Sequence, residues 1–200
     1  MSKSSIKEKM QKQLLYGGAI ECAIPNNFVN TSDIRQVPDH QEVFHELIPT
    51  SSSPRMIVFE ILELQSNNKD CNEAVQYFFE DLADSNGATK EGRKIHTYIK
   101  PQLQKVSDGN IESSGCVGIQ CVDYGNKLRQ YIKVELLLLR MPDVQTDFLI
   151  SHSIPIDTEE FEDLMKSMSS TVVASDISLG KTMLEICISF KVNDWGLFKC

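Results

Sequence analysis

Apolar residues in this chain recur mostly at the spacing of β-strands. They predict strands over residues 19–24, 42–48, 55–65, 94–99, 115–123, 128–140 and 144–154. The segment 55–65 and the run Leu136-Leu137-Leu138-Leu139 are almost continuously apolar, which indicates strands that are covered on both faces. Short turns separate the last three predicted strands, so we expect these three to form an antiparallel meander.

Other segments show the spacing of amphipathic helices. These are residues 71–82, 157–170 and 181–190. Asp70 is a candidate N-cap for the first helix, and Asp157 followed by Glu160 has the spacing of a capping box for the second. Trp195 and Phe198 are expected to fold the C-terminal segment back onto the body of the protein.

Strands outnumber helices and do not alternate with them, which favours the α+β class. We expect a largely antiparallel twisted β-sheet, flanked by helices on both faces, in a single domain. The length of 200 residues fits one domain with a full core. Residues 1–13 are polar and lysine-bearing, so we predict a flexible or weakly helical N-terminal tail there, with the domain spanning residues 14–200.

The formal net charge of −8 argues against a nucleic-acid binder, which needs a basic surface, and favours a basic protein partner. No apolar run approaches the roughly 18 residues of a membrane span, so we expect no membrane insertion. The six cysteines form no C-x-x-C pair and follow no secretory leader, which is typical of a reduced intracellular protein. We expect a monomer.

Motifs for metal, nucleotide or covalent chemistry are incomplete. The four histidines are dispersed, and none forms an i, i+4 helical pair typical of metal sites. Gly180-Lys181-Thr182 resembles the end of a phosphate-binding loop, but position 175 carries serine where that loop requires glycine. We therefore expect no metal, no cofactor and no catalytic residue.

Charged residues are threaded between apolar ones in the first third of the chain. Glu60 lies inside Val58-Phe59-Glu60-Ile61-Leu62, where an unpaired buried carboxylate would be costly. It therefore lies on an exposed patch or pairs with a cation such as Arg35 or Arg55. Glu63 can share a surface with Glu60 only if a bulge, a turn or a strand end intervenes, because residues three apart on a strand face opposite ways.

A second polar group precedes this strand. Its members are Asp33, Arg35, Asp39, Gln41 and Glu42. They either line the same surface as Glu60 or form a rigid turn around Pro38 that local hydrogen bonds hold.

Several segments of the chain are shared with one family. They are Leu15-Tyr16-Gly17-Gly18-Ala19, Asp33-Ile34-Arg35, Val37-Pro38-Asp39, Gln41-Glu42-Val43-Phe44, Val58-Phe59-Glu60-Ile61-Leu62-Glu63, Phe79-Glu80-Asp81-Leu82, Leu139-Arg140, Gln145-Thr146-Asp147 and Asp194-Trp195-Gly196-Leu197-Phe198. On these segments the chain resembles the Mog family of Ran-binding guanine nucleotide release factors. The resemblance covers nearly the whole chain in the right order.

The resemblance implies a Mog/PsbP-like α/β/α sandwich that binds the Ran GTPase and promotes release of its guanine nucleotide. It implies a regulator without covalent catalysis that supports nucleocytoplasmic protein transport, in nucleus and cytoplasm, with other Ran-binding proteins as further possible partners. The family's Ran-contacting acidic positions correspond to Glu60 and Glu63. The neighbouring Ran-binding candidates are Asp33, Arg35, Asp39, Gln41 and Glu42.

Two other functions stay open from the sequence. A scaffold or trafficking adaptor would use the same domain to bind Ran or a membrane-protein tail and would leave nucleotide release unchanged. A small-molecule enzyme built on the same sheet would need a deep pocket with convergent polar groups.

Overall fold

The computed structural model describes residues 8–49, 53–65, 70–101, 110–125, 129–169 and 179–198. Its helices are α1 (Cys71–Ser85), α2 (Thr158–Ser169) and α3 (Lys181–Ser189), with short 3-10 turns η1 (Tyr16–Gly18), η2 (Thr31–Asp33), η3 (Pro142–Val144) and η4 (Trp195–Phe198). Its strands are β1 (Met10–Leu15), β2 (Ile20–Pro25), β3 (Phe28–Asn30), β4 (Gln41–Glu46), β5 (Met56–Glu63), β6 (Ala88–Ile99), β7 (Glu112–Asp123), β8 (Arg129–Met141), β9 (Thr146–Ile156) and β10 (Lys191–Val192).

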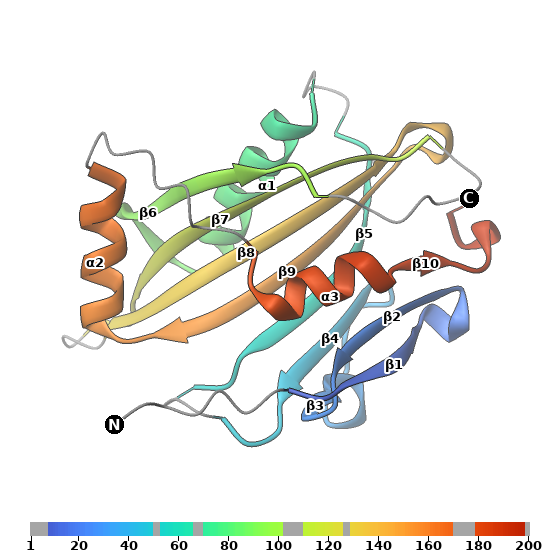
Figure 1. Ribbon diagram of the computed structural model, residues 1–200, viewed down its shortest axis with the longest axis horizontal. Coiled ribbons are helices and arrows are strands. Elements are labelled where there is room, and N and C mark those ends of the chain that lie inside the picture. Colours follow the sequence, from blue (N-terminus) through green and yellow to red (C-terminus); the bar gives the residue numbers. More distant parts are fainter. Residues whose placement is uncertain are drawn as a thin grey trace.

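The long strands form one antiparallel sheet with the order β3-β4-β5-β9-β8-β7-β6, and β1, β2 and β10 form a second, smaller sheet (Figure 1). Strands β7, β8 and β9 follow one another in sequence and pair as neighbours, which confirms the predicted meander. Strand β5 pairs with β9 without interruption from Met56 to Glu63. The N-terminal third of the chain is thereby attached to the centre of the sheet.

Both faces of the main sheet are covered, as the leucine run of β8 predicts. Leu136 and Leu138 belong to the core beneath α1, whereas Leu137 and Leu139 belong to the core beneath α3 and the small sheet. Figure 1 shows α1 on one side of the main sheet and α3 with the small sheet on the other. The predicted α+β class with helices on both faces is confirmed.

Helix α1 lies close to the sheet because Gly118 of β7 has no side chain. A Cβ atom at this position would lie 2.5 Å from Cε2 of Phe79 and 2.8 Å from the carbonyl oxygen of Lys94. The ring of Phe79, which is fully buried, occupies that space. Gly118 thus sets the distance between α1 and the sheet.

The predicted helix caps are confirmed. The Asp70 side chain accepts hydrogen bonds from the amides of Asn72 and Glu73 at the start of α1. Oδ1 of Asp157 accepts a 2.8 Å hydrogen bond from the amide of Glu160 at the start of α2.

The predicted boundary between tail and domain at residue 13 needs correction, because β1 begins at Met10 and pairs along its length with β2. Lys12 forms an ion pair with Glu21 across these strands, at 2.7 Å. The side chain of Glu8 contacts Arg55 and so already belongs to the body of the protein. Strand pairing overrides the polar composition of these residues; residues 1–7 of the predicted tail lie outside the described part.

Phe198 is buried with the core beneath α3, and Trp195 packs against it with ring centroids 5.8 Å apart. The backbone amides of Asn193 and Asp194 donate to the carbonyl of Ala19. The expectation that the C-terminal segment folds back onto the body is therefore confirmed.

Candidate functional site

A groove of about 390 Å³ separates helix α1 from the exposed end of the sheet formed by β4, β5 and β9. It is lined by Arg35, Gln41, Val43, Met56, Val58, Glu60, Leu62, Gln65, Tyr77, Phe78, Asp81, Leu82, Ser85, Leu149 and Ser151. The register of the strands explains which side chains form the floor of the groove. Val43 opposes Val58, and Glu60 opposes both Gln41 and Leu149, so these side chains share one face of the sheet.

Glu60 is the acidic residue of this floor. Its Oε1 atom accepts a 2.5 Å hydrogen bond from Nε2 of Gln41 and lies 3.5 Å from Nε2 of His40. The Glu60 side chain keeps 22% of its surface exposed. Among the described residues neither Arg35 nor Arg55 pairs with it, and the contacts with Gln41 and His40 both involve Oε1. The second carboxylate oxygen is therefore available to a cationic partner.

Arg55, one of the two arginines that the sequence offered as structural partners for Glu60, pairs with other residues. Nη2 of Arg55 lies 2.8 Å from Oε1 of Glu46, a fully buried carboxylate, and also contacts Glu8. The guanidinium group stacks over the ring of Phe28, 5.3 Å from its centroid. These contacts engage Arg55 away from Glu60, whose half-buried carboxylate contacts Gln41 and His40 instead.

Glu63 lies on the other face of β5. The register from Met56 opposite Ser153 to Glu63 opposite Thr146 is unbroken, so Glu60 and Glu63 point to opposite sides of the sheet. Glu63 is exposed at the last position of the strand. Only a partner that reaches around the end of β5 can touch both carboxylates.

The second polar group is divided by the fold. Arg35 and Gln41 join Glu60 in lining the groove, whereas Asp33 and Asp39 are exposed on the segment between β3 and β4. Glu42 has a structural role: its two oxygens accept hydrogen bonds from the amide of Tyr16 and the side chain of Asn30. The alternative of a shared surface with Glu60 therefore applies to Arg35 and Gln41, whereas the Glu42 bonds reach distant residues and not a local turn around Pro38.

Helix α1 supplies a wall that the sequence analysis did not assign to the site. Tyr77, Asp81 and Ser85 recur at intervals of four residues and line the groove. Tyr77 is 45% exposed. This stripe lies next to the predicted apolar stripe, but only the docking of α1 on the sheet decides which polar stripe faces the groove.

Some carboxylates of α1 form ion pairs with cations of the described chain, and others do not. Arg93 of β6 forms ion pairs with both Glu80 and Asp84 on the side of the helix away from the groove. No ion pair within the described residues involves Asp81, which is exposed. The groove consequently has two carboxylates, those of Glu60 and Asp81, set around an apolar floor and opposed by one cation, Arg35.

The far end of the groove is fixed by a buried ion pair. Arg140 and Asp147 oppose each other on β8 and β9, with Nε to Oδ1 at 2.9 Å and Nη2 to Oδ2 at 3.0 Å. The same pair binds the backbone of Gln65, whose amide donates to Asp147 and whose carbonyl accepts from Arg140. Gln65, a residue of the groove, is thus held on both sides.

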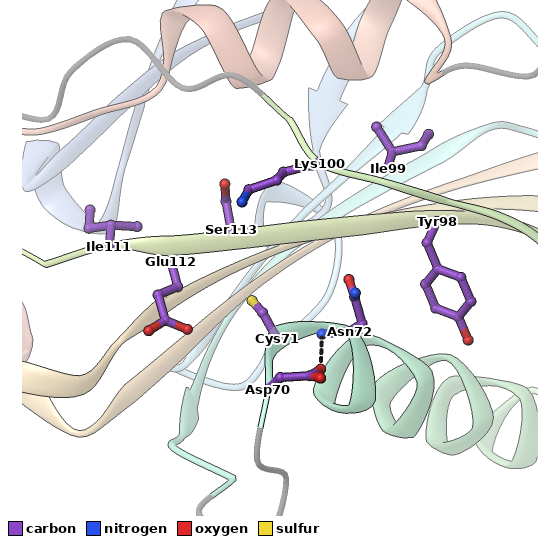
Figure 2. Close-up of a pocket in the computed structure, with 9 residues that line it drawn as sticks. All are labelled: Asp70, Cys71, Asn72, Tyr98, Ile99, Lys100, Ile111, Glu112 and Ser113. Atoms are coloured by element: carbon purple, nitrogen blue, oxygen red, sulfur yellow. Dashed lines mark hydrogen bonds between the residues drawn. The ribbon is translucent and has the colours of Figure 1, made fainter.

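A larger cavity, of about 580 Å³, lies near the start of α1 and contains none of the predicted site residues (Figure 2). Its Asp70 carboxylate already caps the helix, as the dashed line in Figure 2 shows. Burial raises the pKa of the Cys71 thiol to about 11, so this sulfur is protonated at neutral pH and is a poor nucleophile. We assign no chemistry to this cavity.

The segment Gly180-Lys181-Thr182, which resembles the end of a phosphate-binding loop, already binds a carboxylate of this protein. The amide of Gly180, which precedes α3, donates a 3.0 Å hydrogen bond to Oε1 of the buried Glu135. A carboxylate therefore stands where a phosphate would bind at this helix N-terminus. In the described part of the chain, no group of three or more His, Cys, Asp or Glu residues is arranged for a metal ion, and no helix is long and apolar enough to cross a membrane.

The part of the chain that matches known proteins includes every residue of the groove. A family model described as "Ran-interacting Mog1 protein" matches residues 13–155, a span that contains every lining residue. The Ran guanine nucleotide release factor of Danio rerio is 32% identical over 149 residues, covering 71% of this chain and 76% of its own length. The nuclear import protein MOG1 of Saccharomyces cerevisiae is 29% identical over 192 residues, covering 92% and 83%.

The fold has a counterpart among solved structures. The crystal structure of the Saccharomyces cerevisiae Ran-binding protein Mog1p matches with a TM-score of 0.73. The match covers 96% of this chain and 100% of that one at 24% sequence identity, and it shows that the two folds are shared.

Proposed function

Because this chain belongs to the Mog1 family of Ran-interacting proteins, we propose that it binds the small GTPase Ran and promotes release of Ran's guanine nucleotide. The names of its relatives, guanine nucleotide release factor and nuclear import protein, support this function. In our proposal the protein is a monomeric regulator without covalent catalysis that acts in nucleus and cytoplasm. It supports nuclear protein import and binds neither nucleic acid nor membrane.

The observation that carries the proposal for the site is the state of Glu60. Its carboxylate accepts a hydrogen bond from the side-chain Nε2 of Gln41, has no arginine partner among the described residues and lines a groove. A carboxylate fixed in this way binds a cation without first giving up an internal pair with arginine or lysine. We propose that Glu60 accepts a basic side chain of Ran there.

The remainder of the groove suits a protein partner. Val58 and Leu149 provide an apolar floor, and the exposed Tyr77 and Met56, 45% and 36% accessible, stand beside it. Aromatic and methionine side chains around a small apolar centre are enriched in protein interfaces. Asp81 is a second acceptor for a cation on the opposite wall.

We propose that the predicted site residues that lie exposed outside the groove make peripheral contacts with Ran. Asp33 and Asp39 on the β3–β4 segment, and Glu63 at the end of β5, lie outside the groove. Exposed charges of this kind contribute mainly to the rate of encounter with a basic partner and less to the final affinity. We therefore assign the main contact to Glu60.

Nucleotide release follows from competition for positive charge. Basic groups of a GTPase hold the phosphates of its nucleotide. In our proposal Glu60 and Asp81 engage such a group, so that the protein binds nucleotide-free Ran more tightly than loaded Ran. Linkage then requires that this protein weakens nucleotide binding by the same factor, about tenfold for each 1.4 kcal/mol of difference.

The test measures release of a fluorescent guanine nucleotide from purified Ran while this protein is titrated in. The proposal predicts faster release that saturates with concentration. Binding of Ran in a pull-down or calorimeter without faster release would instead support the adaptor function. Absence of any binding would contradict the proposal as a whole.

A further inference from the structure

Tyr16 adopts a backbone conformation that is unusual for its residue type. Its φ angle is +49°, and it is followed by Gly17 at +66° and Gly18 at +96°. Glycine adopts such angles without strain, but a tyrosine there is strained by its side chain. The contacts of Tyr16 must therefore compensate for a conformation that glycine would adopt more easily.

Those contacts converge on the strand pair that carries Glu60. The Tyr16 amide donates to Oε1 of Glu42 at 2.8 Å. Its hydroxyl lies 3.1 Å from the carbonyl oxygen of His40 and 3.0 Å from that of Phe59, and its single proton is shared between them. The ring packs edge-on against Phe148, with centroids 6.1 Å apart.

The two carbonyls belong to the residues immediately before Gln41 and Glu60. These two residues oppose each other on β4 and β5 and are joined by the 2.5 Å side-chain hydrogen bond. The His40 carbonyl also accepts from the amide of Ile61 on the next strand. The hydroxyl of Tyr16 thus contacts the backbone of both strands, directly before Gln41 on β4 and directly before Glu60 on β5.

This end of β4 needs such support because it lacks an outer neighbour. Strand β3 pairs only with Phe44 to Glu46, and within the described residues no strand pairs with the outer edge of Gln41 to Val43. An unpaired edge frays more readily than a central strand. Tyr16 holds this end of β4 in another way, through its hydroxyl at the His40 carbonyl and its amide at the Glu42 carboxylate.

An electrostatic observation agrees with this geometry. Burial raises the pKa of the Tyr16 hydroxyl far above its ordinary value, and the negative charges of Glu42 and Glu60 raise it further. The hydroxyl is therefore a permanent donor at physiological pH and is sensitive to the charge of Glu60.

We propose that Tyr16 is a positioning residue for nucleotide release: its hydroxyl fixes the β4–β5 end so that Glu60 is presented to the partner in one orientation. Tyr16 itself does not contact the partner. This inference rests on the proposed function of the groove. It assigns to the Leu15-Tyr16-Gly17-Gly18 turn a role in presenting the site in addition to reversing the chain.

The test uses Tyr16→Phe, which keeps the ring and removes only the hydroxyl, in the nucleotide-release assay with the full chain. We expect the half-maximal concentration to rise about tenfold, from the loss of a shared hydrogen bond and its orientation, with the maximal rate unchanged. Tyr124→Phe is the matched control, because the Tyr124 side chain is 61% exposed and its hydroxyl bonds to Gln130 near the start of β8. We expect that variant to behave as the native chain.

A double-mutant cycle separates positioning from general stability. In a Glu60→Gln background, Tyr16→Phe is expected to change the half-maximal concentration by less than about twofold, because the group that it positions has lost its charge. An equal effect in both backgrounds, or no effect of Tyr16→Phe on the native chain, would overturn the proposal.

A second arm does not depend on Ran. Amide hydrogen exchange of Ile61, which donates to the His40 carbonyl, is expected to accelerate several-fold in Tyr16→Phe and to stay unchanged in Tyr124→Phe. Unchanged exchange at Ile61 in Tyr16→Phe would overturn the positioning role even if the native chain releases nucleotide. A native chain inactive on Ran, with accelerated exchange, would instead locate the failure in the proposed function.

Discussion

The buried Arg140–Asp147 pair gives the sharpest stability prediction. Their side chains are 7% and 0% exposed and share a bidentate contact, and Asp147 also accepts the amide of Gln65. Removing one member leaves the other charge buried without its partner, which typically costs about 3–5 kcal/mol. We therefore expect Asp147→Asn or Arg140→Met to lower the free energy of unfolding by about that amount.

The double variant is expected to lose less than the sum of the two single losses. Once both charges are removed, no uncompensated charge remains, so a coupling of about 0.5–3 kcal/mol should separate the double variant from additivity. Urea unfolding monitored by circular dichroism measures all four proteins, with the denaturant slope checked for constancy. In a chain of this size each single variant should lower Tm by about 6–20 °C.

Lys166→Met on helix α2 is a suitable control, because its ion pair with Asp163 is exposed at both ends, by 71% and 70%. A surface pair contributes about 0–1 kcal/mol, so this variant should unfold close to the native chain. Two results would refute this reasoning: additive losses at Arg140 and Asp147, or single losses below about 1 kcal/mol. Either would show that the buried pair does not stabilise the fold by holding the backbone of Gln65.

Further predictions concern packing, capping and pH. Gly118→Ala should cost about 1–3 kcal/mol in urea unfolding, because the new methyl group meets the ring of Phe79; native-like stability would show that α1 can shift. Asp70→Ala should cost about 1 kcal/mol by removing the α1 cap, and it should leave nucleotide release intact. Burial opposes ionisation of Glu135, but its hydrogen bond with His152 and the charge of Lys133 outweigh this and lower its pKa below the ordinary 4.5. Its stabilising contribution is therefore complete above about pH 4.5 and is lost as pH falls through the lowered value, so Glu135→Gln should flatten the acid limb of a stability–pH curve; an unchanged limb would contradict this assignment.

The sequence predicted those features that depend on local chemistry. The leucine run of β8 defined a strand buried on both faces, and Asp70 and Asp157 cap helices as their spacing indicates. Each of these signals is contained within a few neighbouring residues.

Features that depend on long-range pairing were missed. Residues 10–13 are polar and lysine-bearing, yet their hydrogen bonds to β2 make them part of strand β1. The α1 wall of the groove, with Tyr77 and Asp81, depends on how closely the helix docks, which Gly118 permits from a distant strand. No local pattern contains that information.

The predicted site was partly assembled by the fold. Glu60, Gln41 and Arg35 meet in one groove, whereas the regular register of β5 sends Glu63 to the opposite face. The period of a strand raised that question in the sequence, and the absence of a bulge in the β5–β9 pairing answers it. The Ran-binding roles of all these residues stay predictions.

The most direct test of the groove compares Glu60→Gln, Asp81→Asn and Glu91→Gln with the native chain in the fluorescent nucleotide-release assay. Glu91 is an exposed carboxylate on β6, away from the groove, so its variant controls for the loss of one charge. A hydrogen bond between charged groups contributes about 1.5–3 kcal/mol, or roughly 10- to 150-fold in affinity. We predict that Glu60→Gln raises the half-maximal concentration by about this factor, Asp81→Asn by about fivefold, and Glu91→Gln by less than twofold. Equal activity of the Glu60→Gln and Glu91→Gln variants would contradict the assignment of nucleotide release to the groove.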